Sequence, residues 1–187
     1  MYNHKGTIPI ETNRLALRRF TPDDAEAMFH TWANDDEVTR YMRWDAHKTV
    51  DETKQVISSW VEKYENEDFY LWSIALKDTN APIGTMGMFC VNSGDMCYEV
   101  AYCTGRAYWG MGYVSEALKA VLEFGLQTVG INRIEAYHAI NNPGSGKVMQ
   151  KCGMSYEGRA RQKYKSHMGF EDCDMYAVLK NDLQQKQ

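Results

Sequence analysis

Several common features are scarce or missing in this chain of 187 residues. It has no apolar run approaching 18 residues, and its first ten residues lack an apolar signal-peptide centre. Its five cysteines are odd in number and include no Cys-x-x-Cys pair, which is typical of reduced thiols in the cytoplasm. Five scattered histidines without a His-Glu-x-x-His motif give no support for a metal site. We therefore expect a cytoplasmic protein with no membrane span and no metal.

A positive net charge is also absent. With 21 Lys and Arg against 25 Asp and Glu, the net charge is −4, which argues against DNA or other nucleic acid as the main partner. Hydrophobic residues make up 44% and aromatic residues 12%, enough to bury roughly 70% of the unfolded surface. Without repeats or linkers, we predict one domain over residues 1–187, with a core at about 10–180 and a polar tail at 181–187.

Hydrophobic periodicity predicts an α+β chain in the order β-α-α-βββ-α-β-α-ββ. The first helix should begin at Thr21-Pro22, and the second at Thr49, where Glu52 completes a capping box. The third should follow Gly112, and the fourth should begin at Pro143 or Ser145. The predicted strands span residues 12–20, 69–77, 83–91, 96–104, 132–140, 156–165 and 173–179, the second to fourth of which form an antiparallel meander.

The most informative stretch is the glycine-bearing segment 105–112, which lies between a predicted strand and a predicted helix. Glycines let the backbone approach a ligand closely, and a helix N-terminus attracts anions. The segment therefore predicts a phosphate or pyrophosphate site, with a simple tight turn as the alternative. It matches neither nucleotide motif: Gly110-x-Gly112 is not followed by a third glycine at the Rossmann spacing, and Gly146-Lys147 lacks the rest of a Walker loop.

Two blocks of sequence resemble one enzyme family. Residues 109–117, WGMGYVSEA, resemble the acetyl-CoA pyrophosphate loop of the GNAT N-acetyltransferases. Residues 142–145 (NPGS), 148–154 (VMQKCGM) and 156–158 (YEG) are similar to the branch that contains the ribosomal-protein N-terminal acetyltransferases. A weaker block at Trp44, His47 and Glu52-Thr53 fits the same branch. The resemblance covers about residues 10–180 and implies a mixed, mostly antiparallel sheet flanked by about four helices.

This resemblance implies that acetyl-CoA is a co-substrate. The loop amides of residues 107–112 would hold its pyrophosphate. The preceding strand would splay from its neighbour, and its amides around Tyr102 and Thr104 would bind the pantetheine arm and polarise the thioester carbonyl. Lys147 and Lys151 could meet the CoA phosphates, although solvated lysines are the simpler interpretation. The implied cofactor contacts are Tyr102, Cys103, Thr104, Ala107, Trp109, Gly110, Met111, Gly112, Tyr113, Ser115, Asn142 and Ser145.

The chain departs from the family pattern at two positions. Ala107 stands where the superfamily motif begins with Gln or Arg, and Arg106 lies one residue earlier. Met149 stands where many family members carry the Tyr that protonates the leaving thiolate. The acid is therefore absent, a water, or another group such as Ser145. Asn142 and Ser145 are also ordinary helix-capping residues, a role compatible with cofactor contact.

An amine acceptor must lose a proton, so a general base is expected. Glu99, on the strand before the loop, and Glu157, after the second block, are the candidates. Either could instead be a solvated or ion-paired carboxylate, and the Glu-Gly pair slightly favours Glu157. A covalent route through Cys103 is disfavoured, because direct attack by the amine in a ternary complex needs no nucleophilic side chain.

Basic residues alternate late in the chain, a spacing that would line one face of a strand. They could contact an acidic protein or ribosomal RNA, or they could block edge-to-edge strand pairing. These residues are Arg159, Arg161, Lys163, Lys165 and His167. Five aromatic residues could line an acceptor site, with core packing as the commoner role: Trp32, Tyr41, Trp44, Tyr164 and Phe170.

The sequence thus predicts acetyl transfer to a primary amine, with a protein N-terminus and small amines both open as acceptors. The alternative is a CoA-binding sensor or regulatory module that has lost catalysis, which Met149 keeps open. Monomer and homodimer remain equally open.

Overall fold

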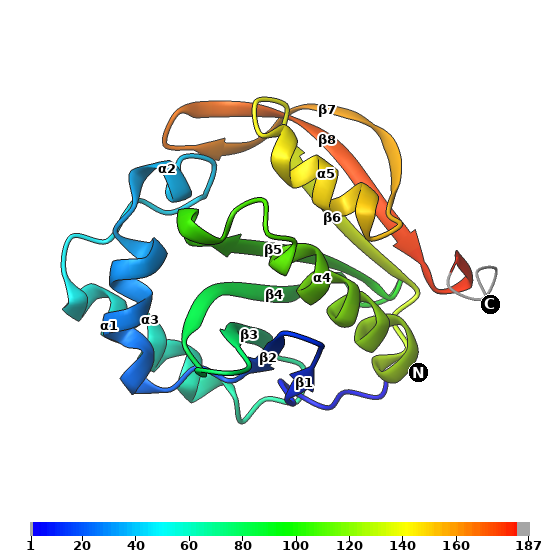
Figure 1. Ribbon diagram of the computed structural model, residues 1–187. Helices are drawn as coiled ribbons and strands as arrows, with labels where there is room; N and C mark the ends of the chain where they lie inside the picture. The colour runs from blue at the N-terminus through cyan, green and yellow to red at the C-terminus, as the bar shows by residue number, and fades with distance from the viewer. Residues whose placement is uncertain (1, 183–187) are drawn as a thin grey trace.

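The computed structural model describes residues 2–182, which form an eight-stranded sheet with helices on both faces (Figure 1). The strands lie in the order β1-β2-β3-β4-β5-β6-β8-β7, and β5 with β6 is the one parallel pair among them. The strands are β1 (Ile10–Glu11), β2 (Leu15–Arg18), β3 (Tyr70–Leu76), β4 (Pro82–Asn92), β5 (Cys97–Thr104), β6 (Arg133–Ala139), β7 (Ser155–Ser166) and β8 (Gly169–Leu179). The helices are α1 (Ala25–Met28), α2 (Asp36–Thr39), α3 (Val50–Lys63), α4 (Tyr113–Glu123) and α5 (Pro143–Lys151).

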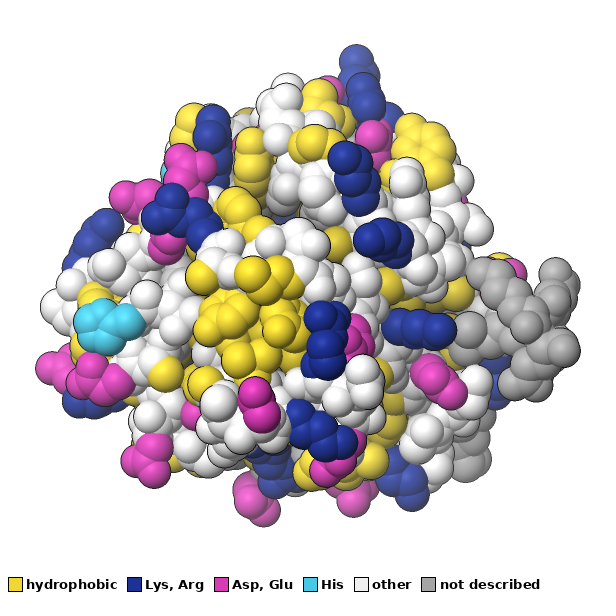
Figure 2. Space-filling view, in the orientation of Figure 1, with side chains coloured by type: hydrophobic (Ala, Val, Ile, Leu, Met, Phe, Trp, Pro, Cys, Tyr) yellow, Lys and Arg dark blue, Asp and Glu magenta, His cyan; other side chains and the backbone are white. Residues whose placement is uncertain are grey.

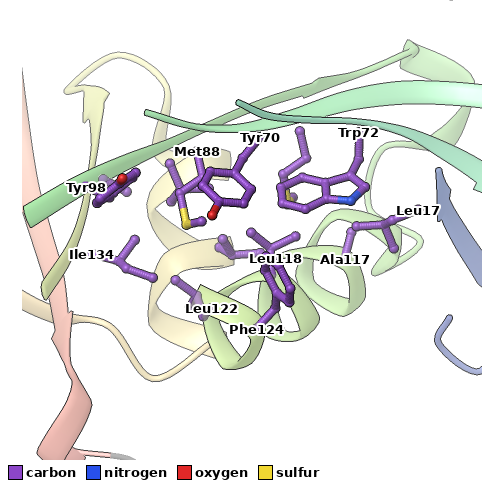
Figure 3. Close-up of a cluster of buried hydrophobic side chains, with 14 of the residues drawn as sticks. Leu17, Tyr70, Trp72, Met88, Tyr98, Ala117, Leu118, Leu122, Phe124 and Ile134 are labelled. Carbon is purple, nitrogen blue, oxygen red and sulfur yellow. The ribbon is translucent and has the colours of Figure 1, made fainter. Parts of the chain in front are cut away.

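The core lies in two layers, one on each face of the sheet. Helices α4 and α5 cover one face, and α1 and α3 pack against the other (Figure 1). Strand β3 shows the consequence, because six of its seven residues are buried and it has no polar side. Figure 3 shows the first layer, in which sheet residues meet α4 and the turn after it. Its labelled members include Tyr70, Trp72, Tyr98, Leu118, Leu122 and Phe124.

The predicted α+β order is confirmed, with two additions and one shortened strand. The strand predicted at residues 12–20 spans only Leu15–Arg18, because residues 12–14 turn back so that β1 can pair with β2. The four-residue helix α2 was also not predicted, which brings the helices to five in the described chain. Elements this short carry too few residues for a periodic pattern. The predicted polar tail lies largely outside the described residues.

The first two of the four predicted helix starts are confirmed, with different capping geometries. Thr21 and Asp24 form a reciprocal capping box, and helical turns run on from Pro22 to Ala33. At α3, the Thr49 hydroxyl accepts the Glu52 N–H at 3.2 Å, as predicted. The Glu52 carboxylate, however, accepts the Lys48 N–H at 2.6 Å.

The parallel pairing of β5 and β6 is short. Only Cys97–Glu99 of β5 pairs with β6, opposite residues 133–135, whereas β4 pairs with β5 as far as Thr104. The two strands therefore part after Glu99, as the family resemblance implied. This parting places the C-terminal half of β5 beside an open edge.

The basic residues of β7 do not form the single face that their spacing predicted. The register shifts between Ala160 and Tyr164, so the alternation is broken at this bulge. Arg159 pairs with Asp174 at 2.8 Å, and Lys163 turns over the ring of Tyr137. Arg161 and Lys165 remain exposed.

No helix within residues 2–182 is long and apolar enough to cross a membrane.

We predict that Asp24 is a major stabilising residue. Its buried carboxylate receives two 2.8 Å hydrogen bonds from Arg18 and one from the Thr21 N–H. Burial raises the pKa of Asp24, but these bonds outweigh it and leave the pKa below its ordinary value. Asp24→Asn should lower the free energy of unfolding by about 3 kcal/mol at neutral pH, because it leaves Arg18 without its anion.

Urea titrations would measure this effect. The difference between wild type and variant should be full above the ordinary carboxyl pKa and shrink as the pH falls below it. Asp51→Asn is the matched control, since its pair with Lys54 is exposed and should change stability little. Equal effects of the two substitutions would contradict this role for Asp24.

Candidate active site

The glycine segment forms a cradle of backbone N–H groups at the start of α4. Gly110 and Gly112 have φ of 74° and 81°, which favour glycine, and a Cβ at Gly110 would meet open space. The helix begins with the bond from the Glu116 N–H to the Gly112 carbonyl, at 3.0 Å. The N–H groups of residues 113–115 are therefore left without acceptors in the helix, as an anion site requires. No side chain caps the helix at Gly112.

Side chains of the loop hold its shape. The Trp109 indole N–H donates to the Thr104 carbonyl at 2.9 Å and closes the loop onto the end of β5. Arg106, the departure noted in the sequence, pairs with Asp35 beside α2 at 2.6 Å and does not cap the loop. Trp109 and Met111 are about half exposed. Figure 2 shows hydrophobic side chains gathered near the middle of the face that carries α4, with Lys and Arg side chains beside them.

A hydrogen-bond network links the turn between β1 and β2 to the glycine loop and the first turn of α4. The Arg14 guanidinium donates to the Glu116 carboxylate at 2.7 Å and to the Met111 carbonyl at 3.1 Å. Its carbon lies 4.3 Å from the centre of the Tyr113 ring. The Glu116 carboxylate also accepts the Thr12 hydroxyl at 2.6 Å and the Arg14 N–H at 2.8 Å. Burial raises the pKa of Glu116, but these hydrogen bonds outweigh it, so the net shift is downward and keeps the carboxylate charged.

The open edge of β5 carries unpaired amides. The Gly105 N–H donates to the Ile83 carbonyl at 3.0 Å, so the odd-numbered residues of β5 bond toward β4. Because antiparallel strands alternate, the N–H groups of Tyr102 and Thr104 point the other way, toward the space that β6 has left. These are the two amides that the resemblance implied for the pantetheine arm.

The start of α5 faces the same opening. The Tyr102 hydroxyl lies 2.9 Å from the Ser145 hydroxyl and 3.2 Å from its carbonyl. Asn142 occupies the N-cap position, but its side chain makes no capping hydrogen bond. Met149 is buried in the core beneath α5. Met149 has no proton to donate, whereas Tyr102 and Ser145 bring two hydroxyls to this opening.

Glu99 lies on the opposite face of the sheet, at the last residue paired with β6. Burial raises the pKa of Glu99, and Lys163, Arg43 and the Tyr137 hydroxyl oppose that shift only in part. The Arg43 guanidinium donates to the Tyr137 oxygen at 2.9 Å. The hydroxyl hydrogen of Tyr137 is then free to point at the Glu99 carboxylate.

Glu157 has different surroundings. It forms a two-bond ion pair with Arg133, which also binds Glu135 at 2.8 Å. These bonds lower the pKa of the Glu157 carboxyl. Glu157 lies on β7, which is separated from β5 by β6 and β8. The structure thus places Glu99, and not Glu157, beside the opening.

All five cysteines are free thiols. Cys103 points to the side opposite Tyr102 and packs against the α1 and α3 layer. Burial raises the pKa of the Cys103 thiol to about 12, so the group is protonated at neutral pH. None of the five cysteines forms a disulfide. Among residues 2–182, no three His, Cys, Asp or Glu side chains gather as a metal site would need.

Four residues of the site were not predicted from the sequence. Arg14, Arg43 and Tyr137 reach it from distant segments, and Glu116 was noted only as part of a motif. Tyr102 was expected to act through its amide alone, yet its hydroxyl also lies at the opening. The sequence pattern carried no signal for these contacts, because each joins residues at least 43 positions apart.

The parting strands and the N–H cradle before α4 have the geometry that a site for acetyl-CoA needs, and comparison with known proteins points to the same class of protein. Residues 14–155 match the family described as "Acetyltransferase (GNAT) domain". The chain belongs to this family and is an acetyl-CoA-dependent acyltransferase.

Its relatives fit the same family. The chain is 30% identical over 171 residues to the uncharacterised N-acetyltransferase YoaA of Bacillus subtilis (strain 168), covering 91% of this chain and 96% of that protein. It is 25% identical over 174 residues to the ribosomal protein uS5-alanine N-acetyltransferase of Escherichia coli (strain K12), covering 86% and 87%. A crystal structure of a GNAT acetyltransferase from Bacillus anthracis is 26% identical, with a TM-score of 0.81 over 93% of this chain and 99% of that one.

We predict that Arg14→Ala weakens acetyl-CoA binding roughly tenfold, because charge-assisted hydrogen bonds that hold the loop are lost. Calorimetric titration with acetyl-CoA would measure it. The rate at saturating acetyl-CoA should change much less, since Arg14 lies away from the opening. Arg40→Ala, which removes an exposed pair with Glu37, is the control and should leave affinity unchanged. Unchanged affinity in Arg14→Ala would contradict this role.

Proposed function

We propose that this acetyltransferase acts on a primary amine, the N-terminal amine of a protein chain, by direct attack in a ternary complex. The observation that carries the proposal is the parting of β5 and β6. It leaves free amides that face the gap, a hydroxyl pair on one side of the sheet and the half-buried carboxylate of Glu99 on the other. Acetyl donor and amine can thus meet through the gap from opposite faces.

Backbone groups would hold the acetyl donor. The N–H groups of the loop and of the first turn of α4 fit a pyrophosphate, because they converge without side chains in the way. The Tyr102 and Thr104 amides fit the pantetheine arm and the thioester oxygen, where fixed donors stabilise developing negative charge. Acetyl-CoA itself supplies the acetyl group as a thioester. Asn142 and Ser145 adjoin the same opening, so contact with the cofactor and their place at the start of α5 are compatible.

Glu99 would serve as the general base. An amine near neutral pH arrives as an ammonium ion and must lose a proton before it attacks. A carboxylate with a raised pKa takes that proton more readily, and Glu99 has one beside the gap. Glu157 has neither a raised pKa nor a place beside the gap, because Arg133 lowers its pKa and it lies on β7.

The Tyr102–Ser145 hydroxyl pair would supply the proton for the leaving thiolate. Burial, the main influence, raises the pKa of Tyr102, so its hydroxyl stays protonated and can donate through Ser145. A thiolate is already a fair leaving group, with a thiol pKa of about 8.5. Assistance from a weak acid is therefore enough, and Met149 does not prevent catalysis.

The likeness to the uS5-alanine acetyltransferase supports a protein N-terminus as the acceptor. Contact with an acidic or ribosomal partner would involve the exposed Arg161 and Lys165, because Arg159 is already paired. This proposal keeps the cytoplasmic location expected from the sequence. A CoA-binding sensor is the competing function, and it requires that no amine is acetylated.

We predict that mass spectrometry of intact products will show a gain of one acetyl group on at least one amine. The screen would present acetyl-CoA with peptides of varied first residue and with small amines, including polyamines. Heat-denatured protein is the control for non-enzymatic acetylation. Binding of acetyl-CoA without product on any acceptor would favour the sensor and contradict the proposal.

We predict that Glu99→Gln lowers kcat/KM by about 100-fold or more, the usual contribution of a general base. In wild type, kcat/KM should fall as the pH drops through the raised pKa of Glu99, because the base becomes protonated. This acidic limb should vanish in Glu99→Gln. Glu157→Gln is the matched control and should keep both rate and limb. The opposite result would assign the base to Glu157.

A further inference from the structure

Two cations face the acceptor side of the opening without a carboxylate partner. Within the described chain, Arg133 and Arg159 are both ion-paired. Arg43 and Lys163, in contrast, form no ion pair with any residue of 2–182. Both approach Glu99, where each opposes the effect of burial on the carboxylate.

Aromatic rings hold the two cations in place. The guanidinium carbon of Arg43 lies 4.9 Å from the centre of the Tyr164 ring, and the Lys163 ammonium lies 5.4 Å from that of Tyr137. The two rings are themselves 5.6 Å apart. Tyr137 is two residues beyond the end of the β5–β6 pairing, so this cluster lies where the two strands begin to separate.

Hydrogen bonds to backbone carbonyls hold the aromatic residues of the cluster in place. The Tyr164 hydroxyl donates to the Tyr41 carbonyl at 2.7 Å, and the Tyr41 hydroxyl donates to the Asn141 carbonyl at 3.0 Å. The first bond ties the β7–β8 hairpin to the segment after α2, which lies beside it in Figure 1. The second bond ties that segment to the turn between β6 and α5. Lys163 lies within the register shift between Ala160 and Tyr164, and its ammonium lies over the Tyr137 ring.

This arrangement raises an electrostatic problem for an ordinary amine. The acceptor arrives as an ammonium ion, and near Glu99 it meets two positive charges against one negative charge. Glu135 also approaches Glu99, and Arg133, which binds Glu135 at 2.8 Å, is shared with Glu157. The two cations that lack an ion-pair partner, Arg43 and Lys163, disfavour an ammonium ion beside them, whereas an acceptor that brings a negative charge of its own would pair with them.

We propose that the acceptor carries a carboxylate within a few bonds of its amine, and that Arg43 and Lys163 bind this carboxylate while Glu99 receives the ammonium group. The proposal rests on the function proposed above and names its substrate class. The planar Arg43 guanidinium suits a carboxylate, because its donors match the two oxygens. A peptide with an acidic first residue and a free amino acid share this chemistry.

Matched acceptor pairs test the proposal. One pair is two tetrapeptide amides that differ only in a first residue of Glu or Gln. The other pair is β-alanine and β-alaninamide, which differ only in the carboxylate. Wild type should prefer the acidic member by roughly tenfold in kcat/KM, as expected for hydrogen bonds to a charged group. The pair with the larger preference identifies the source, peptide or free amino acid.

Charge-removing variants separate recognition from folding. The double variant Arg43→Gln with Lys163→Gln should bring the preference to about one and raise kcat/KM for the neutral member, because repulsion of its ammonium is removed. A structural defect would lower both members alike. Lys54→Gln is the control, since Lys54 is an exposed cation that pairs with Asp51 on α3, and it should keep the wild-type preference. Raising the salt concentration should reduce the preference in wild type and in the control, but not in the double variant.

The outcomes are distinguishable. Equal use of both members by wild type, or an equal loss for both in the double variant, would overturn the carboxylate proposal. If the broader amine screen finds an acceptor but none of these four is acetylated, the carboxylate proposal falls and the acetyltransferase function stands. If no amine in either set is acetylated, both fall.

Discussion

The separation of β5 from β6 after Glu99 is the constraint on which the rest of the structure depends. Three residue pairs hold the strands together, and beyond them β5 keeps β4 as its only partner. Unpaired amides in a sheet are costly unless they find a partner. A ligand that bonds to Tyr102 and Thr104 would complete the sheet, so the fold creates a binding site through an incomplete ladder. The surrounding helices and the β7–β8 hairpin then decide what approaches each side of it.

The two faces of this opening differ in how they are charged. The side of α4 and α5 presents mostly backbone N–H groups and hydroxyls, which bind an anion without a formal positive charge. The side of Glu99 carries full charges on aromatic supports. The net charge of −4 describes neither face, because the N–H cradle before α4 consists of uncharged groups and the cationic pair is only two residues. Local layout, and not composition, determines which ligands fit.

Much of the fold could be predicted from the sequence, because long periodic elements such as β3, β4, α3 and α4 carry strong local patterns. The glycine loop could also be placed, since Gly110 and Gly112 indicate a backbone with positive φ, which other residues avoid. Contacts between distant segments could not. Nothing local to Arg14 indicates that it reaches Glu116, and nothing local to Lys163 indicates that its ammonium lies over the ring of Tyr137. The slight preference for Glu157 over Glu99 had the same origin, because its pairing with Arg133 appears only when β6, β7 and β8 are assembled.

The contact between Arg14 and Glu116 has a consequence for the order in which the molecule is completed. Its partners are 102 residues apart, so the chain must be more than half synthesised before the turn after β1 finds its place. Contacts of such long range are slow to form, since loop closure must precede them. The segment from β4 to α4 contains the glycine loop, yet it lacks this support when it stands alone. The shape of the loop is therefore a property of the assembled chain and not of the glycine motif by itself.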